Sequence, residues 1–175
     1  MSVQPQFVEL PWSGRRVRIE VLRLAPARAR AAWSAIERAQ AVAADATDVE
    51  RALIAAQATR WADPPPADRK GLDEAYARAM RGVWRQFPRD ADVGALFAES
   101  LMDLRPWDLW TPDGHAQPGT DEVIRTLEAV LAVDSNHPLA LHLTVHAVEM
   151  SPTPEKADIA ADRLRTFWTM VAHLQ

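Results

Sequence analysis

The sequence predicts an all-α protein made of stacked antiparallel helix hairpins, with a short N-terminal arm in front of them. Three observations favour this fold class. From Pro26 onward alanine is dense and β-branched residues are sparse, a composition that favours helix. Apolar residues in this part recur at the three- and four-residue spacing of one helix face. Most breaks between these segments are short, and short links place neighbouring helices antiparallel.

The N-terminal arm, residues 1–24, reads differently from the rest of the chain. Residues 7–10 and 17–22 alternate apolar and polar side chains, with Pro11 to Gly14 between them. This pattern is typical of a β-hairpin, and a poorly ordered arm is the alternative. We therefore expect an arm over 1–24 and one helical domain over 25–175.

The helices that follow are predicted from apolar periodicity and from punctuating residues. In chain order they are expected over 27–44, 49–61, 68–86, 93–104, 123–133, 137–150 and 155–173. Thr47 and Glu50 form a capping-box pattern before the second helix, and three prolines at 64–66 end it. Asp90 and Thr120 are expected to cap the fourth and fifth helices. Pro138 stands in the first turn of the sixth, where proline is favoured.

Composition excludes several classes of protein. With 175 residues the chain is long enough for one domain with a real core. It has no cysteine, so disulfides and thiolate chemistry are excluded. The formal net charge of −4 divides into +4 over residues 1–90 and −8 over 91–175. The sequence shows neither a membrane span nor a secretory signal, and its basic residues form no nucleic-acid motif, so we expect a cytoplasmic protein.

Residues 127–140, which read LEAVLAVDSNHPLA, resemble the join between two tetratricopeptide repeats. Leu127 and Val130 stand where that repeat places its packing residues, and residues 76–92 are a looser second match. Such repeats are stable because stacked helix pairs share one continuous core. The resemblance implies a tetratricopeptide-like solenoid.

Three longer stretches, 98–114, 118–122 and 137–152, resemble a group of bacterial tetratricopeptide-repeat-like proteins. The likeness covers about residues 45–173, and it carries no settled activity with it. Members of that group continue beyond the position of Gln175. The resemblance therefore implies a shortened member, and dimerisation that covers an open end is one hypothesis.

The sharpest candidate site is a set of imidazole and carboxylate side chains. His142, His146 and Glu149 share one helix face, and Glu99 and Asp103 share another. If the faces meet, these residues are suitable ligands for zinc, iron or manganese, with His137 and Asp108 as outer partners. A metal-free hydrogen-bond network between the two faces is the main alternative, and solvated surface residues are another. An HExxH motif is absent.

The long loop over residues 105–119 is the second candidate. Trp107 and Trp110 either form a lid over a pocket or fill the core between helix pairs, and His115 is expected to be exposed. The first functional hypothesis from these patterns is a scaffold that binds a protein or peptide. The alternative is a metal-dependent enzyme, a hydrolase or an oxidoreductase, that uses the His/carboxylate set.

Overall fold

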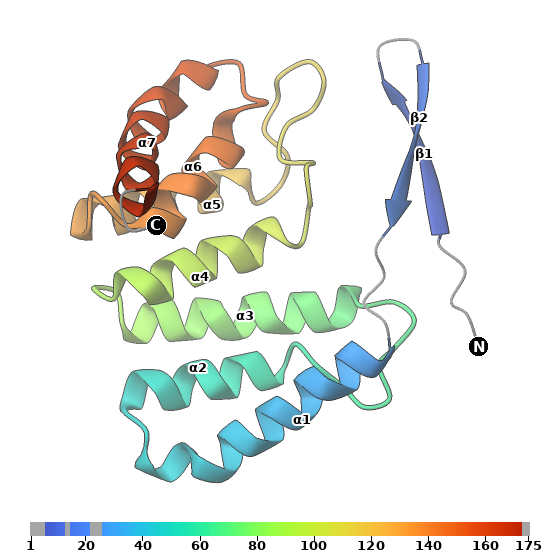
Figure 1. Ribbon diagram of the computed structural model, residues 1–175, viewed down its shortest axis with the longest axis vertical. Helices are drawn as coiled ribbons and strands as arrows, with labels where there is room; N and C mark the ends of the chain where they lie inside the picture. Colours follow the sequence, from blue (N-terminus) through green and yellow to red (C-terminus); the bar gives the residue numbers. More distant parts are fainter. Residues whose placement is uncertain (1–5, 13–14, 22–25, 173–175) are drawn as a thin grey trace.

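The predicted helical class is confirmed. The computed structural model describes residues 6–12, 15–21 and 26–172, and Figure 1 shows the helices following one another in a stack. Each helix packs against the next one in the chain, and α4 also contacts α6. The helices are α1 (Pro26–Val42), α2 (Asp48–Ala58), α3 (Lys70–Gln86), α4 (Ala91–Met102), α5 (Thr120–Val133), α6 (Pro138–Val148) and α7 (Asp158–Ala172). Short 3₁₀ turns at Ala43–Asp45 and Pro154–Ala157 follow α1 and precede α7.

The N-terminal arm contains the β-hairpin that its alternating pattern favours. Strand β1 (Gln6–Trp12) pairs antiparallel with β2 (Arg15–Val21). Leu10 faces Val17 across the ladder, and the first strand continues past the expected end at residue 10 as far as Trp12. The two strands make no extensive contact with any helix among the described residues.

The core lies mainly among α3, α4, α5 and α6. Met80, Val93 and Val130 are fully buried at its centre. Gly94 lets α4 approach its neighbours closely, because a Cβ at this position would come within 2.4 Å of a Val130 methyl carbon. Leu104, which the apolar spacing assigns to the core face of the fourth helix, is instead 40% exposed, because α4 already ends at Met102.

Most of the expected helix caps are confirmed. Thr47 and Glu50 form the complete capping box, and the Asp90 carboxylate accepts a hydrogen bond from the Val93 amide at 3.1 Å. Pro138 stands in the first turn of α6. The role expected for Thr120 is wrong: Gly119, with a φ of 97°, is the N-cap of α5. The buried Thr120 hydroxyl instead donates to the Leu109 carbonyl at 2.6 Å and so anchors the preceding loop.

The helix ends differ from the predicted ones by a few residues. The second helix ends at Ala58 rather than at residue 61, since proline at 64–66 disfavours helix before it. Pro154 opens a 3₁₀ turn ahead of α7. Within the described ranges no helix combines the length and the apolarity that crossing a bilayer requires.

Candidate functional site

A pocket of about 270 Å³ opens between the C-terminal end of α4, the loop over 103–119 and α6. It brings together Glu99 and Asp103, at the end of α4, with His142, His146 and Glu149, on α6 and at its C-cap about 40 positions later in the sequence. We call it the Trp107 pocket. Its lining residues are Glu99, Met102, Asp103, Arg105, Pro106, Trp107, Leu109, Trp110, His142, Leu143, His146, Glu149 and Met150. The two faces singled out in the sequence therefore line one cavity.

The two tryptophans of the loop have different environments. Trp107 is 81% exposed, so it does not fill the core. Its backbone has a φ of 60°, in the left-handed region that residues other than glycine and asparagine seldom adopt. Trp110 is half-buried, packs against the core, and its indole N–H donates to the Ala147 carbonyl at 2.7 Å. Trp110 therefore anchors the loop, and Trp107 is presented to solvent at the edge of the pocket.

The imidazoles lie on the α6 side of the pocket. The rings of His142 and His146 meet edge to face with their centroids 4.5 Å apart, and Trp107 meets His146 in the same way at 5.3 Å. His146 Nδ1 lies 2.9 Å from a Glu149 carboxylate oxygen. No hydrogen bond joins these imidazoles to Glu99 or Asp103 among the described side chains. These edge-to-face ring contacts and the His146–Glu149 pair thus take the place of the expected cross-helix network.

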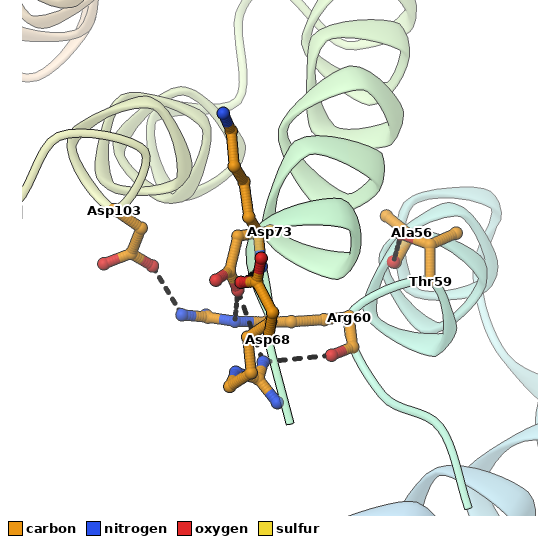
Figure 2. Close-up of polar contacts among 8 residues, drawn as sticks. Ala56, Thr59, Arg60, Asp68, Asp73 and Asp103 are labelled. Carbon is orange, nitrogen blue, oxygen red and sulfur yellow. Dashed lines mark hydrogen bonds and ion pairs between the residues drawn. The ribbon is translucent and has the colours of Figure 1, made fainter. Parts of the chain in front are cut away.

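Asp103 is held by a cation that the sequence analysis did not single out. Figure 2 shows the Arg60 side chain reaching from the end of α2 toward Asp103, the C-cap of α4, and Asp73 on α3. Arg69 donates to the Arg60 carbonyl at 3.1 Å and to Asp73 at 3.3 Å. Asp103 therefore serves mainly as part of this ionic cluster, which links three helices.

Glu99 differs from its acidic neighbours. It is half-buried and lines the pocket, and its carboxylate has no hydrogen bond or ion pair with the described part of the chain. Burial raises the pKa of the neighbouring Tyr76 hydroxyl, and the negative charges of Glu99 and Asp103 add to that increase, while Arg60 opposes it. Glu99 thus presents a carboxylate that is available to a ligand.

Two of the predicted residues lie outside this pocket. The ring of His137 accepts a hydrogen bond from the Ala140 amide, so it caps α6, and its Nε2 lies 3.0 Å from Asp92. Asp108 is exposed and is bonded to Arg105 and Gln117, at 3.2 Å each. Neither residue supports the pocket imidazoles as an outer partner. His115 is exposed, as expected.

The donor set does not meet the requirements of a metal site as it stands. No group of three or more His, Asp or Glu side chains lies close enough to hold a metal ion in the part of the chain that the structure describes. Asp103 is engaged by Arg60, and Glu149 by His146. What remains is a hollow with an exposed indole, two imidazoles in edge-to-face contact and one unengaged carboxylate, which is a surface suited to binding.

Comparison with known proteins finds no family model, no curated protein and no solved structure that matches this chain. The proposed function therefore rests on the geometry of the pocket.

Local sequence patterns did not indicate that Arg60 and Met150 would lie at or next to the site. Arg60 lies 43 positions from Asp103, and no local pattern signals that contact. Met150, at the edge of the pocket, is 63% exposed, and its position just past the His/Glu helix face is the only signal that marks it.

Proposed function

We propose that this protein is a tetratricopeptide-like helical scaffold that binds a partner polypeptide at the Trp107 pocket, where the pocket receives a Lys or Arg side chain. The observation that carries the proposal is that the exposed indole of Trp107 and the unengaged carboxylate of Glu99 line one cavity.

The arrangement of helices supports the scaffold part of the proposal. Each helix packs against its neighbour in the chain, and α4 also packs against α6, as expected where successive helix pairs share a core. The link between α5 and α6 contains the residues that resemble a join between repeats. Stacked pairs of this kind commonly present extended surfaces to partners.

The chemistry of the pocket supports a cationic guest. Three acidic residues line it, of which Glu99 has no described partner, and Arg105 is its one arginine or lysine. A guanidinium or ammonium group is attracted to the face of a tryptophan ring by roughly 0.5–2 kcal/mol. The methylene stem of Lys or Arg also suits the apolar edge formed by Met102 and Leu143.

The test uses blocked tripeptides Gly-Arg-Gly and Gly-Lys-Gly as probes, with blocked Gly-Glu-Gly as the acidic reference, followed by ¹⁵N chemical-shift titration. The expected result is that both basic probes shift resonances of the 103–110 loop and of α6, whereas the acidic probe does not. Trp107→Ala and Glu99→Gln are each expected to weaken binding by roughly threefold to tenfold.

The matched control is Glu37→Gln. Glu37 is an exposed carboxylate on α1, outside the pocket lining, so this variant should bind as the parent does. Equal shifts with the acidic probe, or equal affinity of Glu99→Gln and the parent, would contradict the proposal.

A metal-dependent hydrolase or oxidoreductase is the second candidate. The observation in its favour is that Glu99, His142, His146 and Glu149 all line one pocket. The engaged carboxylates of Asp103 and Glu149 weigh against it. Elemental analysis of the purified protein, repeated on His146→Ala, decides between them: stoichiometric zinc, iron or manganese that disappears in the variant would favour the enzyme.

A further inference from the structure

A second pocket, of about 250 Å³, lies on the other side of α6, between α5 and α7. Both of these helices pack against α6, but they make no extensive contact with each other in the described part of the chain. Trp110 contributes one wall from the loop before α5. We call this cavity the α5–α7 pocket. It is separate from the Trp107 pocket, although the Trp110 side chain lines both.

The interior of the α5–α7 pocket is apolar. Leu127, Leu141 and Val148 form buried walls, and Ala160 closes it from α7. Ile159, which is 69% exposed, extends the apolar surface to the mouth. Burying such surface against a hydrocarbon guest contributes about 25 cal/mol for each Å² removed from water.

The size of the cavity favours a small guest over a polypeptide. Its volume of about 250 Å³ lies just below the roughly 300–1,000 Å³ that is typical of small-molecule pockets. A helix is about 10–12 Å across with its side chains, so a partner helix would not enter. One flexible hydrocarbon chain fits this shape better.

The charges at the edge of the pocket favour an anionic head group. Lys156 lines the pocket and forms no ion pair within the part of the chain that the structure describes. Arg163 binds the Ser135 carbonyl at 2.6 Å, and no described carboxylate pairs with it. Glu128 is the one acidic residue of the lining, so the two basic side chains outweigh it.

From these observations we infer that the α5–α7 pocket binds a free single-chain amphipathic carboxylate. The hydrocarbon chain lies against the leucines of α5 and α6, and the carboxylate meets the Lys156 ammonium at the mouth. This is a reversible binding site, and no covalent step is involved.

Three probes that share one chain length test the inference by isothermal titration calorimetry: octanoate, 1-octanol and octyltrimethylammonium, each kept below the concentration at which it aggregates. The expected order of affinity is octanoate first, octanol second and the ammonium compound last. Octanoate should also raise the melting temperature, because it binds the folded state.

The chain offers a matched pair of variants, because Lys156 and Lys70 are its two lysines. Lys156→Glu should weaken octanoate binding roughly tenfold through charge reversal and leave octanol binding unchanged. Lys70 is exposed at the start of α3 and lies outside the pocket lining, so Lys70→Glu should leave both unchanged. Thr144→Phe should block both ligands by filling the cavity, whereas Thr144→Val, which preserves the shape, should not.

Any of three results would overturn the inference: no measurable binding of octanoate, equal binding of all three probes, or equal affinities in Lys156→Glu and Lys70→Glu. A thermal melt of each variant reports whether it has folded. If Thr144→Phe does not fold, the three probes and the two lysine variants decide the question without it.

Discussion

At the scale of single residues, Arg60 joins three helices through its polar contacts. Its guanidinium lies between Asp73 and Asp103 and also stands over the Tyr76 ring, 4.9 Å from the ring centroid (Figure 2). The side chain is only 26% exposed, so these charges are partly withdrawn from water. Removing the guanidinium of Arg60 would leave the carboxylates of Asp73 and Asp103 without their cationic partner.

We therefore predict that Arg60→Ala lowers the free energy of unfolding by about 1–3 kcal/mol. A double-mutant cycle with Asp103→Asn in urea denaturation should give a coupling energy above about 0.5 kcal/mol. The control is Arg78→Ala: Arg78 is 64% exposed and lies 3.9 Å from Glu74, a surface pair worth little. Additive effects of the Arg60 and Asp103 variants would contradict a stabilising interaction between these two side chains.

Gly94 gives a second prediction at this scale. A Cβ there would stand 2.4 Å from a Val130 methyl carbon and 2.8 Å from the Trp84 ring, so Gly94→Ala should destabilise the protein by about 1–3 kcal/mol through overpacking. Gly82 is an exposed glycine of α3 with nothing within 4 Å of such a Cβ. Gly82→Ala should instead stabilise by about 0.5–1 kcal/mol. The midpoints of urea unfolding should thus move in opposite directions.

At the scale of elements, an ion pair ties α3 to α5. The Arg81 guanidinium donates two hydrogen bonds, each of 2.8 Å, to the Glu122 carboxylate. These bonds lower the pKa of Glu122 from its ordinary value of 4.5, while partial burial opposes the change. Because the pKa is lower in the folded than in the unfolded chain, the pair stabilises the fold above pH 4.5.

This stabilisation should be lost as the pH falls through the lowered pKa of Glu122. We predict that Glu122→Gln is less stable than the parent at pH 7 and that the difference shrinks as the pH falls below about 4.5 and through the lowered pKa of Glu122. Urea unfolding at a series of pH values measures it. Glu128→Gln, also on α5 but without an ion pair among described residues, is the control, and a constant difference for Glu122→Gln would contradict the assignment.

The helices and their caps also show which structural features local sequence patterns can predict. The seven helices follow from apolar periodicity and from breaks, because both act within a few residues. The Thr47 cap is local in the same sense. Thr120 misleads because its hydroxyl finds a partner in Leu109, and His137 misleads because it caps its own helix. In both cases a nearby backbone group competes successfully with the role that the pattern favours.

At the scale of the whole molecule, the order in which the helices pack decides which side chains line the Trp107 pocket. Helical spacing alone places His142 and His146 on one face, and the stacking of α4 with α6 brings Glu99 toward them. The exposure of Trp107 and the engagement of Asp103 depend on contacts across the chain, which no local pattern encodes. The pocket is thus foreseeable in position, whereas its chemistry depends on the tertiary structure.

The charge distribution of the whole chain leads to a prediction about binding. The part that forms the Trp107 pocket belongs to residues 91–175, which hold 13 acidic and 5 basic residues. Such a field attracts cations and is screened by salt, with a Debye length of about 8 Å at physiological ionic strength. Titration of blocked Gly-Arg-Gly should therefore give an affinity that falls markedly from low to high salt. An affinity independent of salt would contradict the charge argument.

The division of the chain into an arm and a helical domain leads to the last prediction. The strands β1 and β2 pair with each other, and the described residues show no extensive contact between them and any helix (Figure 1). The core cluster among the described side chains is formed by the helices and the loop before α5. A chain that begins at Pro26 should therefore keep its helical circular dichroism and melt within a few degrees of the full chain, since about 1 kcal/mol corresponds to roughly 2–4 °C at this size.

The matched comparison removes the other end of the stack. A chain that stops before α7, at Ser151, exposes the apolar surface that α7 covers on α6. Leu141 and Val148 would lose part of their cover, and each large apolar side chain that returns to water costs roughly 1.5–3 kcal/mol. Its melting temperature should fall by far more than that of the chain without the arm. If the two truncations are equally destabilising, the hairpin is part of the same cooperative unit as the helices and the boundary near residue 25 is wrong.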